Sequence, residues 1–336
     1  MPQPDMALPF KTPDLVAHRS QRSEGSPLLQ GPMGALRLAW QDCFNRIAEA
    51  LARRGHTVLP ITVPGSEITA ALANASGADV VIMPHRQHFQ CPSLEIPALY
   101  LMQIAHRWLF TLDTKGWGAG ADAYPYDRFD YASVDESVFC RYQRWINEDN
   151  ESKFHQPDRR SRDALIADGI LPKQNYVFFP CQIPDDEVVR FFCDVSEEEV
   201  IAALVSWANK RGVRILLKAH PAAPRTSETF RSIAQGENIQ WVDASIHDLI
   251  ENCEAVYTLN SGVGHEAILH CKPVVMFGRS EYDRLAIRAS VDDLDGAYEK
   301  VKNWRESDAI ESYQKFYHWF TRHKSIDLRD DEHLDD

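Results

Sequence analysis

The second half of the chain alternates short apolar runs with amphipathic helical patterns, and this alternation restricts the possible folds more than any other feature. The runs lie at Tyr176–Phe179, Val213–Ala219, Ile239–Val242, Ala255–Leu259 and Pro273–Phe277, and the expected helices at Glu197–Lys210, Thr226–Ala234, Ile246–Cys253 and Gly264–Cys271. Strands that alternate with helices form a parallel sheet covered by helices. The pattern therefore predicts a Rossmann-like α/β unit.

The first half shows the same rhythm over shorter elements. Trp40, Phe44, Ile47 and Leu51 recur at helical spacing, and strands are expected at 57–61, 78–83 and 98–102, with a helix at 66–75. Residues 147–162 contain almost no apolar side chain and are predicted to be a linker. We expect an irregular lead-in at 1–30, Rossmann-like domains at 31–165 and 166–305, and a C-terminal helix with an acidic tail at 306–336.

Length and charge limit the classes of function. The length of 336 residues favours two domains. The formal net charge of -13 argues against general nucleic-acid binding, because phosphate backbones attract clustered Lys and Arg. The seven cysteines form no CxxC pair, which indicates buried, reduced thiols rather than disulfides or zinc ligands. The absence of a long apolar stretch predicts a cytoplasmic protein.

Polar residues follow four of the strands expected in the second half, where the ligands of such folds bind. These residues are Gln182 with Asp185 and Asp186, then Lys218 with His220, then the segment from Asn260 to Glu266, and finally the segment from Gly278 to Tyr282. All four groups are predicted to meet at the carboxyl edge of one parallel sheet.

The segment from Asn260 to Glu266 has the clearest chemistry. Gly262 and Gly264 would let a phosphate approach the backbone at the start of a helix, and Ser261 adds a hydroxyl donor. Glu266, one turn later, could accept hydrogen bonds from a ribose diol. The alternative is an ordinary strand-to-helix turn with a buried capping serine.

Lys218 and His220 alternate along an extended backbone, so both side chains can leave the strand on the same side and meet a phosphate or carboxylate. The alternative for His220 is a hydrogen-bonded structural histidine. Asp185 and Asp186 are adjacent, so we expect one of them to enter the site as nucleophile or general base. The alternative for this pair is a solvated turn.

In the first half, residues 111–120 form a glycine-rich loop. Trp117 could stack on a sugar, and Asp113 could act as a general acid or base. The alternative is a tight loop with a packing tryptophan. The histidines of the run 85–88 have poor spacing for a metal site, so they are interpreted as substrate contacts or loop residues.

Together these motifs resemble a known family. Gln182-x-x-x-Asp186, His220-Pro221, Asn260-Ser261, Gly264-x-Glu266-Ala267 and Lys272-Pro273-Val274 are similar to the nucleotide-sugar half of bacterial retaining β-Kdo transferases. Those enzymes help to build capsular polysaccharides, their lipid anchors and some O-antigens. The resemblance covers residues 175–282 and implies a GT-B architecture, in which two Rossmann-like domains with parallel sheets face a central cleft.

The resemblance also implies residue roles. Asp186 would attack the anomeric carbon of CMP-β-Kdo and form a covalent adduct, His220 and Ser261 would hold the phosphate, and Asp113 would assist the acceptor. The implied donor-binding set is Gln182, Lys218, Asn260, Ser261, Gly262, Gly264, Glu266 and Tyr282. Trp117 and Lys115 would bind the acceptor, and neither a cofactor nor a metal is implied.

The implied partners are a nucleotide sugar and a glycan or glycolipid acceptor, handled at the inner face of the membrane beside a polysaccharide assembly complex. Three other interpretations stay open. The chain could be another GT-B transferase with a CMP or CDP donor, such as a sialyltransferase-like enzyme or a glycerophosphate transferase. It could be a sugar-nucleotide epimerase, or an inactive nucleotide-sugar-binding partner.

Overall fold

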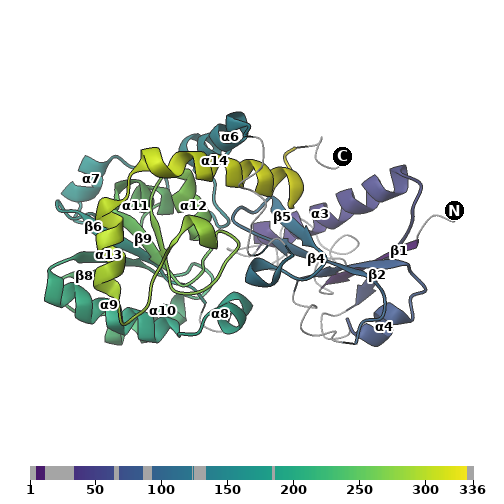
Figure 1. Ribbon diagram of the computed structural model, residues 1–336, viewed down its shortest axis with the longest axis horizontal. Helices are drawn as coiled ribbons and strands as arrows, with labels where there is room; N and C mark the ends of the chain where they lie inside the picture. The colour runs from purple at the N-terminus through teal and green to yellow at the C-terminus, as the bar shows by residue number, and fades with distance from the viewer. Residues whose placement is uncertain are drawn as a thin grey trace. The chain divides into compact units, whose positions relative to one another are not determined.

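The computed structural model describes residues 5–11, 34–63, 68–85, 93–122, 124, 134–183 and 186–330. The expectations for Asp185, Arg86, His88, most of the lead-in and the last six acidic-tail residues lie outside these ranges. The chain divides into two compact units (Figure 1). One comprises Met1–Tyr124 with Phe320–Asp336, and the other comprises Pro125–Trp319.

The second unit is built on a parallel sheet. Its strands within the described residues lie in the order β11-β10-β9-β6-β7-β8, and every neighbouring pair is parallel. Their bounds are β6 (Tyr176–Pro180), β7 (Arg214–Lys218), β8 (Ile239–Trp241), β9 (Ala255–Thr258), β10 (Val274–Met276) and β11 (Ile287–Arg288). The five strands predicted between residues 176 and 277 are therefore confirmed, with no end shifted by more than one residue.

Helices cover both faces of this sheet, as the apolar runs predicted. Val177 and Phe179 point to a core formed with α9 (Glu197–Arg211), α10 (Pro224–Ile233) and α13 (Leu294–Asn303). On the other face, the Tyr176 hydroxyl donates to the Leu249 carbonyl of α11 (Ile246–Asn252) at 2.8 Å. The remaining elements of this unit are α6 (Glu136–Glu148), α7 (Arg162–Ala167), α8 (Glu187–Phe192), α12 (Val263–Leu269) and η5 (Asp283–Leu285).

The ends of α9 follow directly from its sequence. The Ser196 hydroxyl accepts from the Glu199 backbone N–H, and the Glu199 carboxylate accepts from the Ser196 N–H, which forms a capping box. Gly212 closes the helix at φ +70°, a left-handed conformation that glycine adopts without steric strain. Local chemistry alone therefore determines both ends.

The first unit carries a mixed sheet. Its described strands lie in the order β12-β5-β4-β3-β1-β2, with β5 and β12 antiparallel to their neighbours. Their bounds are β1 (Asp5–Lys11), β2 (Thr57–Val63), β3 (Val80–Pro84), β4 (Ala98–Gln103), β5 (Leu109–Asp113) and β12 (Ser325–Asp327). The expected parallel pairing holds for β2, β1, β3 and β4. It ends at β5, because the short connection between β4 and β5 permits only an antiparallel pair. The expectation of an irregular lead-in is also wrong for Asp5–Lys11, which form β1.

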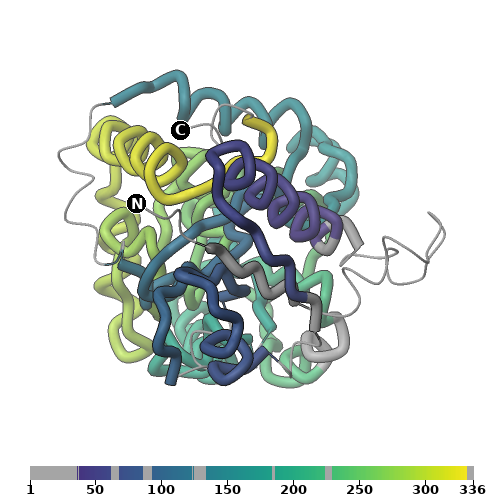
Figure 2. Tube along the Cα trace, turned by 90° about the vertical axis from the view of Figure 1, so that its right-hand side faces the viewer, coloured from purple at the N-terminus to yellow at the C-terminus, as the bar shows by residue number. Residues whose placement is uncertain are grey.

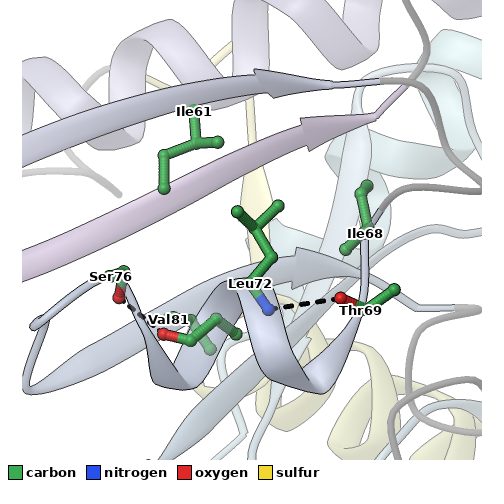
Figure 3. A pocket seen from close by; sticks show the side chains of 7 residues that line it. Ile61, Ile68, Thr69, Leu72, Ser76 and Val81 are labelled. Carbon is green, nitrogen blue, oxygen red and sulfur yellow. Dashed lines mark hydrogen bonds between the residues drawn. The ribbon is translucent and has the colours of Figure 1, made fainter.

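Two helices cover the first sheet. Cys43 and Phe44 of α3 (Gly34–Arg53) pack on one face with Phe110, and α4 (Ala70–Asn74) packs on the other. Figure 2 shows α3, in dark purple, running into the strand β2 that follows it. Figure 3 shows a small apolar pocket beneath α4, in which the Thr69 hydroxyl accepts from the Leu72 N–H at 3.2 Å. This pocket is lined by no charged side chain and is distinct from the residues predicted to bind a nucleotide.

The boundary between the units differs from the expected one near residue 165. Helix α6 belongs to the second unit, where the Gln143 amide donates to the Leu269 carbonyl of α12 at 2.8 Å. Helix α14 (Glu306–His323) begins in the second unit and ends in the first, and it leads into β12. The C-terminal segment is thus part of the first sheet rather than only a solvated tail.

The predicted linker 147–162 is an ordered part of the second unit. Arg159 Nε donates to Asp248 Oδ1 at 2.5 Å, and the Arg160 N–H donates to Asp248 Oδ2 at 3.0 Å. Asp248 is buried, with 1% of its surface exposed. Polar residues that suggested a linker therefore bind this segment to α11.

None of the described helices is long and apolar enough to cross a membrane.

We expect the substitution Asp248→Ala to lower the free energy of unfolding by about 3 kcal/mol, because it leaves the Arg159 guanidinium without its buried counter-ion. Urea unfolding followed by tryptophan fluorescence measures this change. Glu251→Ala is the matched control, since Glu251 binds the same guanidinium from an exposed position and its loss should change stability by less than about 1 kcal/mol. Equal effects of the two variants would contradict the anchoring role of Asp248.

Candidate active site

The polar residues that follow β6, β7 and β9 meet at the carboxyl edge of the second sheet. β6 lies between β9 and β7, and the direction of chain progression across the sheet reverses between β6 and β9. Ligands of open α/β sheets bind at such a switch point. The structure thus brings together Gln182, His220, Asn260 and Ser261, as the sequence predicted.

Gln182 and Asn260 lock the two sides of the switch point together. The Gln182 side-chain amide donates to Asn260 Oδ1 at 3.2 Å, and the Asn260 backbone N–H donates to Gln182 Oε1 at 3.1 Å. Asn260 Nδ2 also donates to the carbonyls of Val188 and Arg279, at 2.8 Å and 3.2 Å. Both side chains are buried, so their geometry fits them to position the loops rather than to contact the donor directly as expected.

Tyr282 supports the turn after β9 from below. Its side chain is fully buried, and its hydroxyl donates to the Ser261 carbonyl at 2.5 Å. The expected direct contact between Tyr282 and the donor is therefore not possible in this structure. The Ser261 hydroxyl accepts from the Val263 N–H at 3.2 Å, which leaves its own hydrogen available for a ligand.

Gly264 is required by the close approach of Tyr282. A Cβ atom at this position would lie 2.3 Å from Tyr282 Cζ. Gly264 was expected to admit a phosphate, and the structure shows that it leaves room for the Tyr282 ring.

We expect Gly264→Ala to destabilise the protein by roughly 1–3 kcal/mol, because the added methyl displaces the Tyr282 ring. The measurement is thermal or urea unfolding of Gly264→Ala, Tyr282→Ala and the double variant. Since the alanine at 282 removes the clash, the double variant should lose less stability than the sum of the two single losses. Strict additivity would show that the two residues do not interact.

His220 is set up as a neutral hydrogen-bond donor. Its Nδ1 accepts from the Ala222 backbone N–H at 3.1 Å, so in the neutral ring the proton resides on Nε2. Burial lowers the pKa of His220 to about 4, and the ammonium of Lys153 acts in the same direction against the opposing effect of Asp186. At neutral pH His220 therefore offers an N–H and no positive charge.

Lys218 does not join His220 as expected. Its ammonium donates to Asp243 Oδ1 at 3.0 Å and to the Ala244 carbonyl at 2.8 Å. Both partners follow β8 at the outer side of the sheet. The neighbouring carboxylate determines the direction of this flexible side chain.

Asp186 is exposed and lies at the first turn of α8. Its carboxylate accepts from the Val188 N–H, at 3.4 Å, as an N-cap. Lys153 and His220 both experience the charge of Asp186, since it raises the pKa of each of them. The carboxylate is thus accessible and close to the predicted phosphate-binding histidine.

Glu266 is buried at 2% exposure behind the turn. Burial raises its pKa to about 8, and a hydrogen bond from the Ser152 hydroxyl and the charge of Lys153 reduce this effect. Within the described part of the chain, Glu266 Oε1 has no hydrogen-bond partner. A ribose hydroxyl could satisfy this oxygen, which agrees with the predicted role. Next to it, His265 Nε2 lies 2.6 Å from Glu281 Oε1.

Glu197 is a buried support that the sequence did not reveal. Its Oε1 accepts from the Gln182 backbone N–H at 2.6 Å, and burial raises its pKa to about 8 against the lowering effect of that bond. In sequence it is one of three consecutive glutamates in the first turn of α9, where acidic residues are common for helix-dipole reasons alone. No sequence signal separated it from its two exposed neighbours.

The raised pKa of Glu197 makes stability depend on pH. The folded-state pKa of about 8 exceeds the ordinary value of 4.5, so the folded protein binds the proton more tightly and loses stability as pH rises from about 4.5 to about 8. We expect Glu197→Gln to reduce this loss by on the order of 3 kcal/mol, measured as urea unfolding between pH 5 and pH 9. The exposed neighbour provides the control, because Glu198→Gln should leave the pH dependence unchanged.

In the first unit, the predicted loop residues have structural tasks. Asp113 accepts from the backbone N–H groups of Lys115, Gly116 and Asp122 at 2.8–3.0 Å, so its carboxylate holds the loop rather than standing ready as an acid or base. Trp117 is 1% exposed and packs edge-on against His85 at 5.1 Å. The expectation of an exposed stacking tryptophan is wrong, because the ring completes the core. Lys115 pairs with Asp122 at 2.7 Å and stays largely exposed.

Both the sequence and the fold are similar to those of known proteins. The family model of capsule polysaccharide biosynthesis proteins matches residues 137–298. The structure of the beta Kdo 2,4 transferase of Thermosulfurimonas dismutans KpsC is 16% identical, with a TM-score of 0.51 over 75% of this chain and 85% of that chain. The beta Kdo 2,7 transferase of the same protein is 14% identical, with a TM-score of 0.49 over 91% of this chain and 99% of that chain.

A more distant structural match is the UDP-GlcNAc 2-epimerase of Methanocaldococcus jannaschii, 9% identical, with a TM-score of 0.44 over 98% of this chain and 97% of that chain. No curated protein matches the sequence. The family match over residues 137–298 supports the expected resemblance to proteins of capsule polysaccharide biosynthesis, and the chain has an α/β fold of the GT-B class that is similar to that of a Kdo transferase.

Proposed function

We propose that the protein is a retaining glycosyltransferase of surface polysaccharide synthesis, which moves Kdo from CMP-β-Kdo to a glycan or glycolipid acceptor. One observation carries this proposal. The neutral His220 N–H and the Ser261 hydroxyl follow the two strands on either side of β6, and the exposed Asp186 carboxylate follows β6 itself. Two hydrogen-bond donors suited to a phosphate thus flank a potential nucleophile.

In the proposed reaction, His220 and Ser261 bind the phosphate of the donor. An Asp186 oxygen attacks the anomeric carbon as the bond from that carbon to the phosphate oxygen breaks, and CMP leaves with the electron pair. Fixed hydrogen-bond donors around the phosphate stabilise the charge that develops on it. The acceptor hydroxyl then attacks the same carbon as its bond to Asp186 breaks, Asp186 leaves as a carboxylate and the hydroxyl proton passes to solvent, which gives net retention.

The neighbouring residues support this reaction. The unpartnered oxygen of Glu266 is suited to a ribose hydroxyl, and Gln182 with Asn260 holds the loops that carry Asp186 and Ser261. CMP-β-Kdo is a substrate here, and the proposal includes no cofactor. The acceptor chemistry is that of capsule or O-antigen assembly, and we place the reaction in the cytoplasm at the inner face of the membrane.

A second candidate function follows from the two residues that would bind the phosphate. His220 and Ser261 recognise a phosphate and not a particular sugar, so the same site suits another CMP-linked sugar or a CDP-linked donor. An inactive binding partner would use the same two residues for binding alone.

The test is intact-mass measurement of the protein after incubation with freshly generated CMP-Kdo, together with an assay for CMP release. The wild-type protein should gain the mass of one Kdo and release CMP, whereas Asp186→Asn should do neither. Asparagine still caps α8, so the fold should survive. Asp185→Asn is the matched control and should behave as the wild type.

Three results would change the proposal. If Asp185→Asn loses activity and Asp186→Asn keeps it, the nucleophile is Asp185. Turnover of another CMP- or CDP-linked donor in place of CMP-Kdo would favour the second candidate. Nucleotide binding without adduct or turnover would indicate a binding partner instead of an enzyme.

A further inference from the structure

We infer that Lys153, from the segment predicted to be a linker, is the cation that binds the donor phosphate. The inference rests on the proposed function insofar as it treats the carboxyl edge of the second sheet as a nucleotide site. In this role Lys153 replaces Lys218, whose ammonium is directed to Asp243 and the Ala244 carbonyl. Four observations support it: the fixed backbone on both sides of Lys153, its neighbours, its charge environment and the absence of charge on His220.

The backbone around Lys153 is held from both sides. Asn150 Oδ1 accepts from the Ser245 hydroxyl at 2.8 Å, and the Glu151 carbonyl lies 2.7 Å from His247 Nε2. On the other side, Gln156 Oε1 accepts from the Ile246 N–H at 3.0 Å. All three contacts reach the first turn of α11 or the residue before it. Lys153 therefore stands on a rigid support rather than on a free loop.

The residues next to Lys153 contact the site directly. The Ser152 hydroxyl hydrogen-bonds to the buried carboxyl of Glu266. The Phe154 ring lies 5.1 Å from the His220 ring in an edge-on arrangement. Since residues 152 and 154 touch the groups that follow β9 and β7, residues 152–154 form one wall of the site.

The half-buried ammonium of Lys153 lies within the electrostatic reach of four site residues. Burial lowers its pKa, and the carboxyl groups of Asp186, Glu281 and Glu266 act against this. Its charge in turn lowers the pKa of His220. Lys153 thus lies close to both Asp186, the proposed nucleophile, and His220, which is proposed to donate a hydrogen bond to the phosphate.

The charge balance leaves a role for this cation. A phosphate at the strand ends would meet a neutral His220, whose pKa is about 4, and a Lys218 already paired with Asp243. The raised pKa of Glu266, about 8, keeps that carboxyl largely protonated at neutral pH. Lys153 adds a positive charge to this edge of the sheet, beside the carboxylates of Asp186 and Glu281.

A purely structural role for Lys153 makes a different prediction. If Lys153 only neutralised the surrounding carboxylates, its loss would weaken the binding of a nucleoside and of the corresponding nucleotide to the same extent. If Lys153 binds the phosphate, its loss should affect the nucleotide alone. The ratio of the two affinities separates the roles.

The experiment is calorimetric titration of the full chain with CMP and with cytidine. Wild-type protein should prefer CMP, and Lys153→Met should lower the affinity for CMP about tenfold or more with little change for cytidine, because a charge-assisted hydrogen bond is lost. Lys153→Arg should restore part of the preference. Lys210→Met, an exposed lysine on α9, is the control for net charge and should match the wild type.

The possible outcomes are distinct. A preference for CMP that persists in Lys153→Met, or that disappears only in Lys218→Met, would overturn the inference and leave the proposed function intact. If the wild type instead prefers UMP over uridine and Lys153→Met loses that preference, the inference holds and the CMP-Kdo donor fails. If no nucleotide is preferred over its nucleoside, both fail. Thermal melting checks the fold, and Lys153→Arg keeps the test decisive if Lys153→Met does not fold.

Discussion

The paired hydrogen bonds between Gln182 and Asn260 are the contact on which the site depends. They join the residue after β6 to the residue after β9, where the order of strands reverses and a parallel sheet opens a crevice. Glu197 accepts a hydrogen bond from the Gln182 backbone, and Asn260 in turn donates to the Val188 carbonyl in the first turn of α8 and to the Arg279 carbonyl after β10. Because Gln182 and Asn260 are buried and hydrogen-bonded to each other, the loops carrying Asp186 and Ser261 have a defined geometry before any ligand binds.

Burial organises the charges of this site as much as ion pairing does. It keeps His220 neutral and raises the pKa of Glu266, so two groups that a sequence suggests as charged offer hydrogen bonds instead. Positive charge then comes from Lys153, in a segment fastened to α11 by the buried pair of Arg159 and Asp248. A segment with almost no apolar residues is thus part of the site wall, and several of its polar residues make buried contacts with α11.

Local patterns carried most of the fold of the second unit. The apolar runs at β6, β7, β9 and β10, and the capping box with Gly212 on α9, each report a local requirement of burial or of helix ends. In the first unit, β5 and β12 escaped prediction because such short strands have little periodicity of their own. Their pairing depends on a turn after β4 and on a segment more than 200 residues away in the sequence.

The sequence by itself determined where polar residues follow buried strands, and hence that Asp186, His220 and Ser261 come together, because parallel strands place their carboxyl ends on one edge. What each side chain does depends on the tertiary structure. In the second unit, Lys218 turns to Asp243, Tyr282 is buried, and Lys153 lies within the electrostatic reach of Asp186. In the first unit, Trp117 is buried and Asp113 holds its own loop. The physical reason is that a side chain's direction and protonation depend on neighbours distant in sequence, which no local pattern encodes.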